Sequence, residues 1–369
     1  MVSRLAAETS EPTAQAALAP AASPPARHRI GGLDALRGLA ALSVLVGHYT
    51  ANYHRLYGHS DQLLFSYPYA GYGVTLFFII SGFVILMTAE RAARPIDFAW
   101  ARFSRLYPAY WTALIVTFAV VNVFALPGRR ASLSRAVANL TMFQHTFGVG
   151  NVDSVYWTLQ VELCFYAIVL ALLYFRRVRY TEFVLMGLVA LSLVDAALLG
   201  RLDGAWADRV RELLILDHAF AFLIGVLLYR SLKSPRWWHL PAIVACLAAK
   251  LPTGPHADAY VSAALAVLVG VTTRGYLKFL EARVLVFLGT VSYPLYLTHQ
   301  NIGYVIIRAG YGAGLNPNVS IVIAAAAALL VATAITFGVE RPAMAFLRDR
   351  RPGRHSVRAA LPTPVALPA

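Results

Sequence analysis

The sequence predicts an all-α integral membrane protein, a bundle of about ten transmembrane helices with both termini in the cytoplasm. Of its 369 residues, 59% are hydrophobic and only 14% are charged, and long uncharged apolar runs recur along the chain. An average soluble domain carries about 25% charged residues, whereas one bilayer crossing needs about 20 consecutive, mainly apolar residues. The apolar surface of this chain is therefore expected to face lipid.

Runs of suitable length define ten candidate crossings. They cover residues 35–52, 69–89, 109–126, 157–174, 182–199, 213–230, 237–250, 257–273, 284–307 and 319–339. The seventh run is short, so the distribution of Lys and Arg serves as an independent check. With ten crossings, most of the 32 Lys and Arg fall on the side of the N-terminus, as the positive-inside rule expects of cytoplasmic segments. Without the seventh crossing, the basic loop at 274–283 and the basic C-terminal tail would lie outside.

The chain is expected to hold one folded domain, at residues 30–342. Residues 1–29 are rich in Ala and Pro and lack the apolar core of a signal peptide, which predicts a retained disordered tail. Residues 343–369 form a basic, Pro-rich cytoplasmic tail. Cys164 and Cys246 lie inside apolar runs, so neither a disulfide framework nor a thiolate metal site is indicated.

The net charge of +14 does not indicate a nucleic-acid partner. The basic residues form short clusters between apolar runs instead of lining one face, which is the pattern of charges that set membrane topology. The lipid bilayer is the partner that the composition predicts, and no particular oligomeric state follows from it.

Few ionisable residues lie at bilayer depth, and each is a functional candidate because its insertion costs about 2.5 to 3.5 kcal/mol. Arg37 and His48 are eleven residues apart, about three helical turns, and share one face of the first crossing. Asp34 lies one turn from Arg37 and can pair with it. Glu162 and His299 fall near the outer ends of the fourth and ninth crossings, at a depth similar to that of His48. The alternative is that each polar residue is satisfied separately and ties helices together.

Arg102 and Arg105 are three residues apart and lie on one face if the third helix begins early. Guanidinium groups suit phosphate, although topogenic charge is the simpler explanation for these two alone. The combination of a cytoplasmic anion-binding mouth with a deeper titratable cluster would fit a cofactor that has a phosphorylated head and a long arm ending in a thioester.

Other polar residues have two open interpretations. Asp195, Asp217 and His218 lie toward the outer ends of their helices, where they either line an acceptor cleft or simply approach water. Trp157 and Tyr166 are interfacial anchors or stack on an acceptor. No serine or cysteine is indicated as a covalent nucleophile, and Ser81 is interpreted as a helix-packing residue beside Gly82.

The segments LDALRGLAALSVLVGHY, YGVTLFFIISGFVIL, RFSRLYPAYW, YWTLQVELCFY and SYPLYLTHQ, in this order, resemble the bacterial acyltransferase 3 family of membrane O-acyltransferases. The resemblance covers residues 30–342. It implies about ten helices, an acyl-CoA donor on the cytoplasmic side and acylation of carbohydrate or similar hydroxyls. The family's basic residue and histidine map onto Arg37 and His48, its two-arginine motif onto Arg102 and Arg105, its tryptophan-to-glutamate motif onto Trp157 and Glu162, and its late histidine onto His299. Many relatives have WSLSVEEQFY where this chain has WTLQVELCFY, a change expected to affect packing or acceptor shape.

The predicted function is therefore a multi-pass O-acyltransferase of the bacterial inner membrane. It would move an acyl group, expected to be acetyl, from acyl-CoA to a carbohydrate hydroxyl, with no permanently bound cofactor and no metal. His48 is the expected general base, Glu162 the residue that orients it, and His299 a residue that binds the acceptor or shares proton transfer, with the last two roles exchangeable. The other expected contacts are with the donor at Arg37, Arg102 and Arg105, and with substrate at Asp34, Trp157 and Tyr166.

Two other functions compete with this one. Polytopic bundles with charges near the midplane are often transporters, here an exporter of a glycan or a lipid-linked precursor. Transporters commonly show inverted repeats and paired broken helices, and the sequence shows neither. A scaffold or sensor without catalysis would leave the buried His and Glu residues as a costly polar network without a use.

Overall fold

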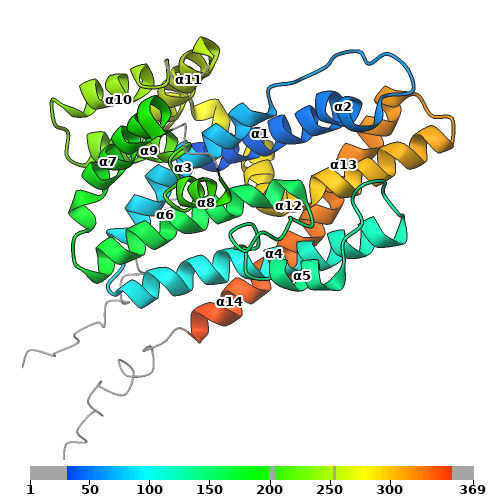
Figure 1. The fold of residues 1–369 in the computed structure, drawn as a ribbon, viewed down its shortest axis with the longest axis horizontal. Coiled ribbons are helices and arrows are strands. Elements are labelled where there is room, and N and C mark those ends of the chain that lie inside the picture. Colours follow the sequence, from blue (N-terminus) through cyan, green and yellow to red (C-terminus); the bar gives the residue numbers. More distant parts are fainter. Residues whose placement is uncertain (1–30, 200–203, 252–254, 351–369) are drawn as a thin grey trace, which may run out of the picture. The chain divides into compact units, whose positions relative to one another are not determined.

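The structure, a computed structural model, describes residues 31–199, 204–251 and 255–350, and in this part of the chain every regular element is a helix. The expected tail at 1–29 and residues 351–369 lie outside the described residues. The α-helices are α1 (Gly31–Gly47), α2 (Tyr53–Tyr57), α3 (Ala70–Ala89), α4 (Pro95–Val123), α5 (Leu133–Asn139), α6 (Trp157–Tyr174), α7 (Thr181–Val194), α8 (Ala205–Leu213), α9 (Ala219–Lys233), α10 (His239–Ala248), α11 (His256–Thr273), α12 (Arg283–Gly312), α13 (Pro317–Ile335) and α14 (Arg341–Asp349), as Figure 1 shows. Short 3₁₀ and π segments adjoin them: η1 (His48–Asn52), η2 (Ser154–Tyr156), η3 (Val178–Tyr180), η4 (Asp195–Leu199), η5 (Lys278–Glu281) and η6 (Thr336–Glu340).

Each of the ten predicted crossings contains a helix. Six helical segments among the described residues are long and apolar enough to cross a membrane: Ala70–Ala89, Pro95–Val123, Ser154–Tyr174, Val178–Ala197, His256–Thr273 and Pro317–Asp349. The seventh predicted crossing corresponds to the short apolar helix His239–Ala248. The protein is thus an all-helical, multi-pass membrane protein, while ten crossings and cytoplasmic termini stay predictions.

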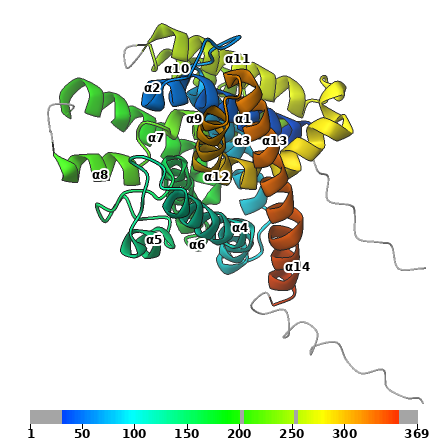
Figure 2. The same ribbon diagram turned by 90° about the vertical axis from the view of Figure 1, so that its right-hand side faces the viewer.

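Helix α12 lies at the centre of the described helices and packs against α1, α4 and α13, and α3 packs against α1 and α9 (Figure 2). Glycine allows two of these contacts. A Cβ atom at Gly289 would lie 1.9 Å from the carbonyl oxygen of Asp34, and one at Gly225 would lie 1.9 Å from that of Ile79. Small residues let membrane helices approach closely, so α1 touches α12, and α3 touches α9, at backbone distance.

Helix α4 begins at Pro95, well before the predicted start at residue 109. Pro95 stands in the first helical turn, where its missing N–H costs nothing, and Asp97 adds a favourable negative charge there. An apolar-run criterion misses this part because it contains Arg102 and Arg105. The early start meets the condition under which these two arginines share one helix face.

The first helix widens where its histidine lies. Helix α1 passes at Gly47 into the π-helical segment η1, which begins with His48. Such wide turns are rare and occur often at functional sites, because they change the direction of side chains on an otherwise regular helix.

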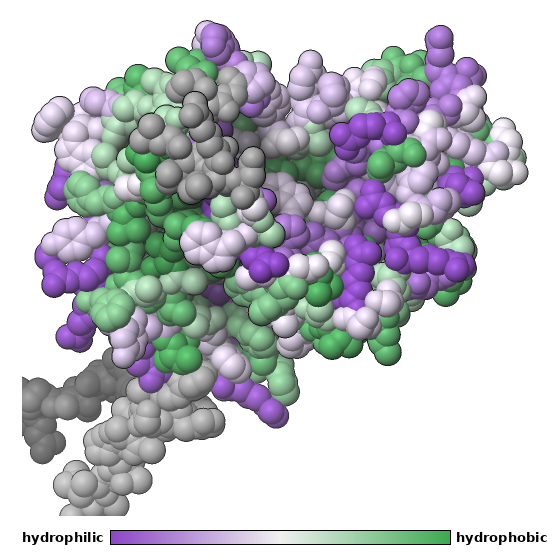
Figure 3. Space-filling model, viewed as in Figure 1, coloured by the Kyte–Doolittle hydropathy of each residue, from purple (hydrophilic) through white to green (hydrophobic). Residues whose placement is uncertain are grey.

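On the face drawn in Figure 3, apolar side chains gather over α6 to α9, and hydrophilic ones are more frequent toward the end with α2 and α5.

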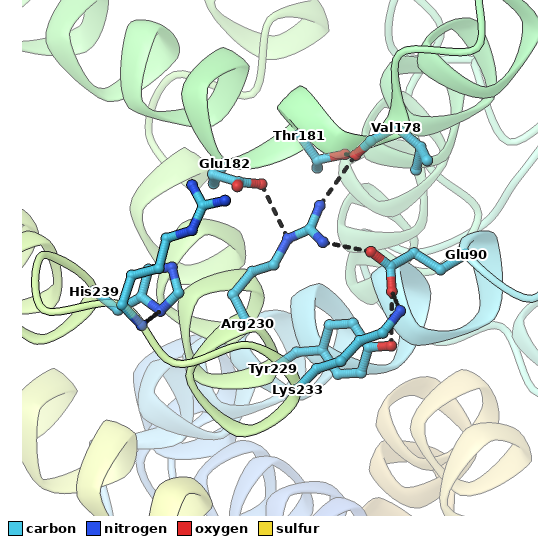
Figure 4. Close-up of polar contacts among 9 residues, drawn as sticks. Glu90, Val178, Thr181, Glu182, Tyr229, Arg230, Lys233 and His239 are labelled. Carbon is cyan, nitrogen blue, oxygen red and sulfur yellow. Dashed lines mark hydrogen bonds and ion pairs between the residues drawn. The ribbon is translucent and has the colours of Figure 1, made fainter.

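An ion-pair network, here called the Arg230 network, connects α3, α7 and α9 through Glu90, Glu182, Tyr229, Arg230 and Lys233 (Figure 4). Arg230 lies 2.5 Å from Glu90, donates to Glu182 at 3.1 Å and donates to the carbonyl oxygen of Val178 at 3.3 Å. Lys233 and Tyr229 both donate to the second oxygen of Glu90. The guanidinium of Arg230 is thus satisfied on several sides by protein groups.

Candidate active site

The structure brings together the histidines of α1/η1 and α12. Nδ1 of His48 lies 2.6 Å from Nε2 of His299. The ring planes are 13° apart and the ring centroids 4.9 Å apart. With nitrogen atoms this close, that centroid distance means that the rings meet edge to edge, which is the in-line geometry of an N–H···N hydrogen bond. The two histidines form a pair, here called the histidine pair.

The surrounding hydrogen bonds assign the proton positions of the neutral pair. Nδ1 of His299 lies 2.9 Å from the carbonyl oxygen of Tyr296 and 3.1 Å from that of Leu295. Carbonyl oxygens only accept, so Nδ1 of His299 carries the proton and its Nε2 accepts. Nδ1 of His48 must then be the donor. Nε2 of His48 consequently holds a lone pair, and it makes no hydrogen bond to any residue that the structure describes.

Close packing holds the helix around His299 in place. The hydroxyl of Tyr49, the residue after His48, donates to the carbonyl oxygen of His299 at 2.7 Å. A Cβ atom at Gly303, one turn further along α12, would lie 2.1 Å from that hydroxyl oxygen. His299 and Tyr49 are fully buried. Both rings of the pair are therefore fixed by backbone-anchored contacts.

A cavity of about 760 Å³, including the open space at its mouth, lies between α1, α3, α4, α6 and α12. Its walls combine basic, acidic, aromatic and aliphatic residues: Arg37, Val74, Phe77, Phe78, Ile80, Ser81, Val84, Ile85, Arg102, Arg105, Leu106, Thr158, Leu159, Glu162, Tyr166, Tyr293 and Tyr296. We call it the arginine-lined cavity, and Tyr296 is the lining residue that lies nearest to the histidine pair.

Three arginines give the cavity its charge. Arg105 is paired with the buried Glu340 and lies 5.7 Å from the centre of the Tyr293 ring. Arg102 lies 5.9 Å from the centres of two aromatic rings, and its Nε is buried without a hydrogen-bond partner among the described residues. A buried guanidinium nitrogen without an acceptor is costly. An anionic ligand in the cavity would supply that acceptor.

Glu162 lies in this cavity rather than beside the histidine pair. One of its carboxylate oxygens accepts hydrogen bonds from the hydroxyls of Ser81, at 3.0 Å, and Tyr166. Ser81 thus contacts a candidate site residue, in addition to the packing that Gly82 provides against the carbonyl of Phe222. Its hydroxyl beside a glutamate was not foreseen, because the sequence gives no relative placement of α3 and α6.

The structure therefore divides the predicted site residues into two groups. His48 and His299 meet at the histidine pair, and Arg37, Arg102, Arg105, Glu162 and Tyr166 share the arginine-lined cavity. Tyr296 connects the two groups, since it lines the cavity and its ring centre lies 5.9 Å from that of His299.

Two further predicted residues lie outside both groups. The Trp157 ring packs 5.2 Å from His218 and 6.4 Å from Phe78, measured between centroids. Asp34 contacts α12 at Gly289. Sequence reasoning also missed Glu340, which pairs with Arg105 at the cavity. A carboxylate directly after a long apolar run was the available signal.

No group of three or more His, Cys, Asp or Glu side chains among the described residues could hold a metal ion. Both cysteines are free and buried. That the reaction uses neither a metal ion nor a cysteine nucleophile stays a prediction.

Comparison with known proteins identifies the class. The model of a family described as an acyltransferase domain matches residues 30–337. The chain belongs to this acyltransferase 3 family and is an acyltransferase.

Among curated proteins, it is 28% identical over 299 residues to the exopolysaccharide production protein ExoZ of Rhizobium meliloti (strain 1021), covering 76% of this chain and 91% of that protein. It is 29% identical over 184 residues to the O-acetyl transferase of Shigella phage Sf6, covering 46% of this chain and 54% of that protein. It is 36% identical over 124 residues to protein 2 in the picA locus of Rhizobium radiobacter, covering 31% of this chain and 58% of that protein. No solved structure matches the chain.

Proposed function

We propose that the protein transfers an acyl group, most simply acetyl, from acyl-CoA to a hydroxyl group of a carbohydrate, with His48 as general base. The observation that carries this proposal is the histidine pair, whose hydrogen bonds leave a lone pair on Nε2 of His48. A partly buried base aligned in this way, near a cavity that a neighbouring tyrosine lines, suits proton abstraction from a bound hydroxyl. The transporter alternative gives no use for this proton arrangement.

In the proposed step, Nε2 of His48 accepts the proton of the acceptor hydroxyl while the hydroxyl oxygen attacks the thioester carbonyl. The new C–O bond forms, the C–S bond breaks, and the proton on His48 passes to the leaving thiolate, so CoA departs as a thiol. His299 acts as a positioning residue, since its hydrogen bond fixes the orientation and tautomer of His48. This gives His299 the orienting role that the sequence first suggested for Glu162.

The arginine-lined cavity is the proposed donor site. Arg37, Arg102 and Arg105 would bind the phosphates of the CoA moiety, because guanidinium groups form strong charge-assisted hydrogen bonds to phosphate. The arm of the donor would extend past Glu162 and Tyr166 toward Tyr296, whose ring centre lies 5.9 Å from that of His299. Glu162 keeps one carboxylate oxygen for an N–H group of that arm, since Ser81 and Tyr166 occupy the other.

The names of the relatives indicate the acceptor class. One is an exopolysaccharide production protein and another an O-acetyl transferase, so we infer a polysaccharide or its precursor as acceptor. The location that fits a multi-pass enzyme of this kind is the bacterial inner membrane.

The proposal is tested with the purified protein in lipid nanodiscs, supplied with acetyl-CoA labelled in the acetyl group and with the polysaccharides of the source cell after chemical removal of their esters. We expect release of CoA thiol together with alkali-labile label on the polysaccharide. His48→Ala should lower kcat by about 10² to 10⁴, the usual contribution of general-base catalysis.

His256→Ala, which changes an exposed histidine at the start of α11, is the matched control and should leave turnover unchanged. Unaltered turnover of the His48→Ala protein would remove the base assignment. Movement of glycan into proteoliposomes without consumption of acetyl-CoA would favour the transporter.

A further inference from the structure

A second cleft lies at the opposite end of α3 from Glu90 and the Arg230 network. It occupies about 910 Å³, including open space, where α3, α9 and α11 begin and α10 ends. Its lining is rich in groups that contact sugars: Tyr69, Tyr72, Asp217, His218, Lys250 and Asp258. We call it the tyrosine cleft. It is separate from the arginine-lined cavity and shares none of its lining residues.

The aromatic residues of the cleft continue toward the histidine pair. The rings of Tyr69 and Tyr72 are stacked at 6.0 Å and 13°, and the ring of Tyr67 meets Tyr69 edge-on at 5.6 Å. The hydroxyl of Tyr67 lies 2.9 Å from Ser43 Oγ, and its backbone N–H donates to the side chain of Thr50, two residues from His48. A row of three tyrosines therefore connects the cleft with the surroundings of the proposed base.

A second connection runs toward the donor cavity. The ring of His218, which lines the tyrosine cleft, lies 5.2 Å from Trp157 and 5.1 Å from Phe78, which lines the arginine-lined cavity. Tyr72 and Phe78 are six residues apart on α3, about 9 Å along a helix. The cleft is thus near enough to hold one part of a molecule whose other part reacts beside His48.

The charges of the cleft point to a neutral ligand. Asp217 and Asp258 contribute two carboxylates, and Lys250 one ammonium group, which lies 4.3 Å from the centre of the Phe220 ring. The hydroxyl of Tyr72 donates to Asp258 at 2.9 Å and thereby orients that carboxylate. Carboxylates accept hydrogen bonds from hydroxyl groups, and tyrosine rings offer flat apolar faces with a polar edge. A polyanion would be repelled by the two carboxylates.

We propose that the tyrosine cleft is a remote subsite for a neutral pyranose unit of an oligosaccharide acceptor, so that the enzyme binds a chain of several sugars rather than a monosaccharide. The inference rests on the proposed function, since the cleft is an acceptor subsite only if the protein acylates a sugar, but sugar binding can be measured without catalysis. Sugars stack on Tyr69 and Tyr72 while their hydroxyls donate to Asp217 and Asp258, and the chain follows the tyrosine row to His48.

Saturation-transfer NMR on the nanodisc-embedded protein tests this subsite, with cellohexaose, maltohexaose, glucose and hexagalacturonate as probes. We expect transfer from the protein to the protons of a neutral hexaose, with weaker transfer to glucose and to the anionic hexagalacturonate. Asp258→Asn should weaken hexaose binding about fivefold, the equivalent of one hydrogen bond of about 1 kcal/mol, and Tyr69→Ala should weaken it at least as much.

Two controls separate this inference from the proposed function. Tyr174→Ala removes an exposed tyrosine at the far end of α6 and should leave binding unchanged. His48→Ala should lower the rate of acyl transfer by about 10² to 10⁴ while hexaose binding persists. Equal hexaose binding by the wild type, Asp258→Asn and Tyr69→Ala, or no binding of either neutral hexaose, would overturn the subsite. Hexaose binding without any acyl transfer by the wild type would instead contradict the proposed function.

Discussion

Arg230 and Arg102 are both partly buried arginines of a membrane protein, but their surroundings differ. Arg230 has two carboxylates and a carbonyl oxygen as acceptors, all supplied by the protein (Figure 4). Arg102 faces a cavity, packs beside aromatic rings and keeps its Nε without an acceptor among the described residues. A guanidinium whose hydrogen-bond acceptors all come from the protein connects helices, whereas one that lacks an acceptor is a candidate to bind a ligand.

The largest effect is expected from breaking the satisfied cluster. Arg230→Met would leave Glu182 without its counter-charge and Glu90 with Lys233 alone, at exposed side-chain fractions of only 6% and 10%. Removing one partner of a buried ion pair costs about 3 to 5 kcal/mol. Thermal unfolding in detergent should show a clear loss of stability, with the acyl-CoA KM of the surviving protein unchanged. As a control, Arg179→Met changes an exposed arginine and should alter neither the stability nor the KM. If Arg230→Met instead raised the KM for acyl-CoA at unchanged stability, Arg230 would not differ from Arg102 in the way we infer.

A smaller and different effect is expected at the cavity. Arg102→Met would remove a ligand contact but no protein ion pair, so we expect the acyl-CoA KM to rise roughly ten- to a hundredfold, the value of a charge-assisted hydrogen bond of about 1.5 to 3 kcal/mol, at nearly unchanged stability.

Arg105→Met provides the comparison, because Arg105 both lines the cavity and pairs with the buried Glu340. It should raise KM and lower the unfolding temperature together. An unchanged KM for acyl-CoA in both variants would show that these arginines do not bind the donor and serve only to set membrane topology.

The smallest effect concerns acid pH. Burial alone would raise the pKa of the Glu90 carboxyl, but hydrogen bonds from Lys233 and Tyr229 and the charge of Arg230 outweigh it and hold this pKa below its ordinary value. A lowered folded-state pKa contributes stability above the pKa of the unfolded chain, and this contribution is lost as pH falls through the folded-state value. The unfolding temperature should therefore decrease below about pH 4.5.

In Glu90→Gln, stability at neutral pH should be lower and this acid-dependent part should disappear. The measurement is thermal unfolding of both proteins between about pH 3 and 7, with the titration range taken from ordinary glutamate values. An acid limb that is identical in the two proteins would show that Glu90 does not contribute to it.

The helices were largely predictable, because apolar runs long enough to cross a bilayer can be recognised directly in the sequence. The expected crossing at 157–174 coincides with α6. The start of α4 was not found, since arginines interrupt its apolar pattern although Pro95 and Asp97 mark a helix start. The family, too, could be predicted from five short motifs, and the match over residues 30–337 confirms it.

The site was predictable only in part. Helical periodicity gives the depth of a residue along its own helix, so His48, Glu162 and His299 were expected at one level. It does not give which neighbour each helix faces. The structure places His299, and not Glu162, against His48, and it places Glu162 with Ser81 and Tyr166.

By itself, the sequence determined that this chain is a helical membrane acyltransferase. Composition, the length of apolar runs and the order of motifs can all be determined without knowing which helices contact one another. The tertiary structure alone decided which polar groups satisfy one another. Proton positions on the histidine pair, the saturation of Arg230 and the open Nε of Arg102 all depend on close approaches between helices far apart in the chain, and such approaches are set by packing at glycine-rich interfaces, not by any single helix.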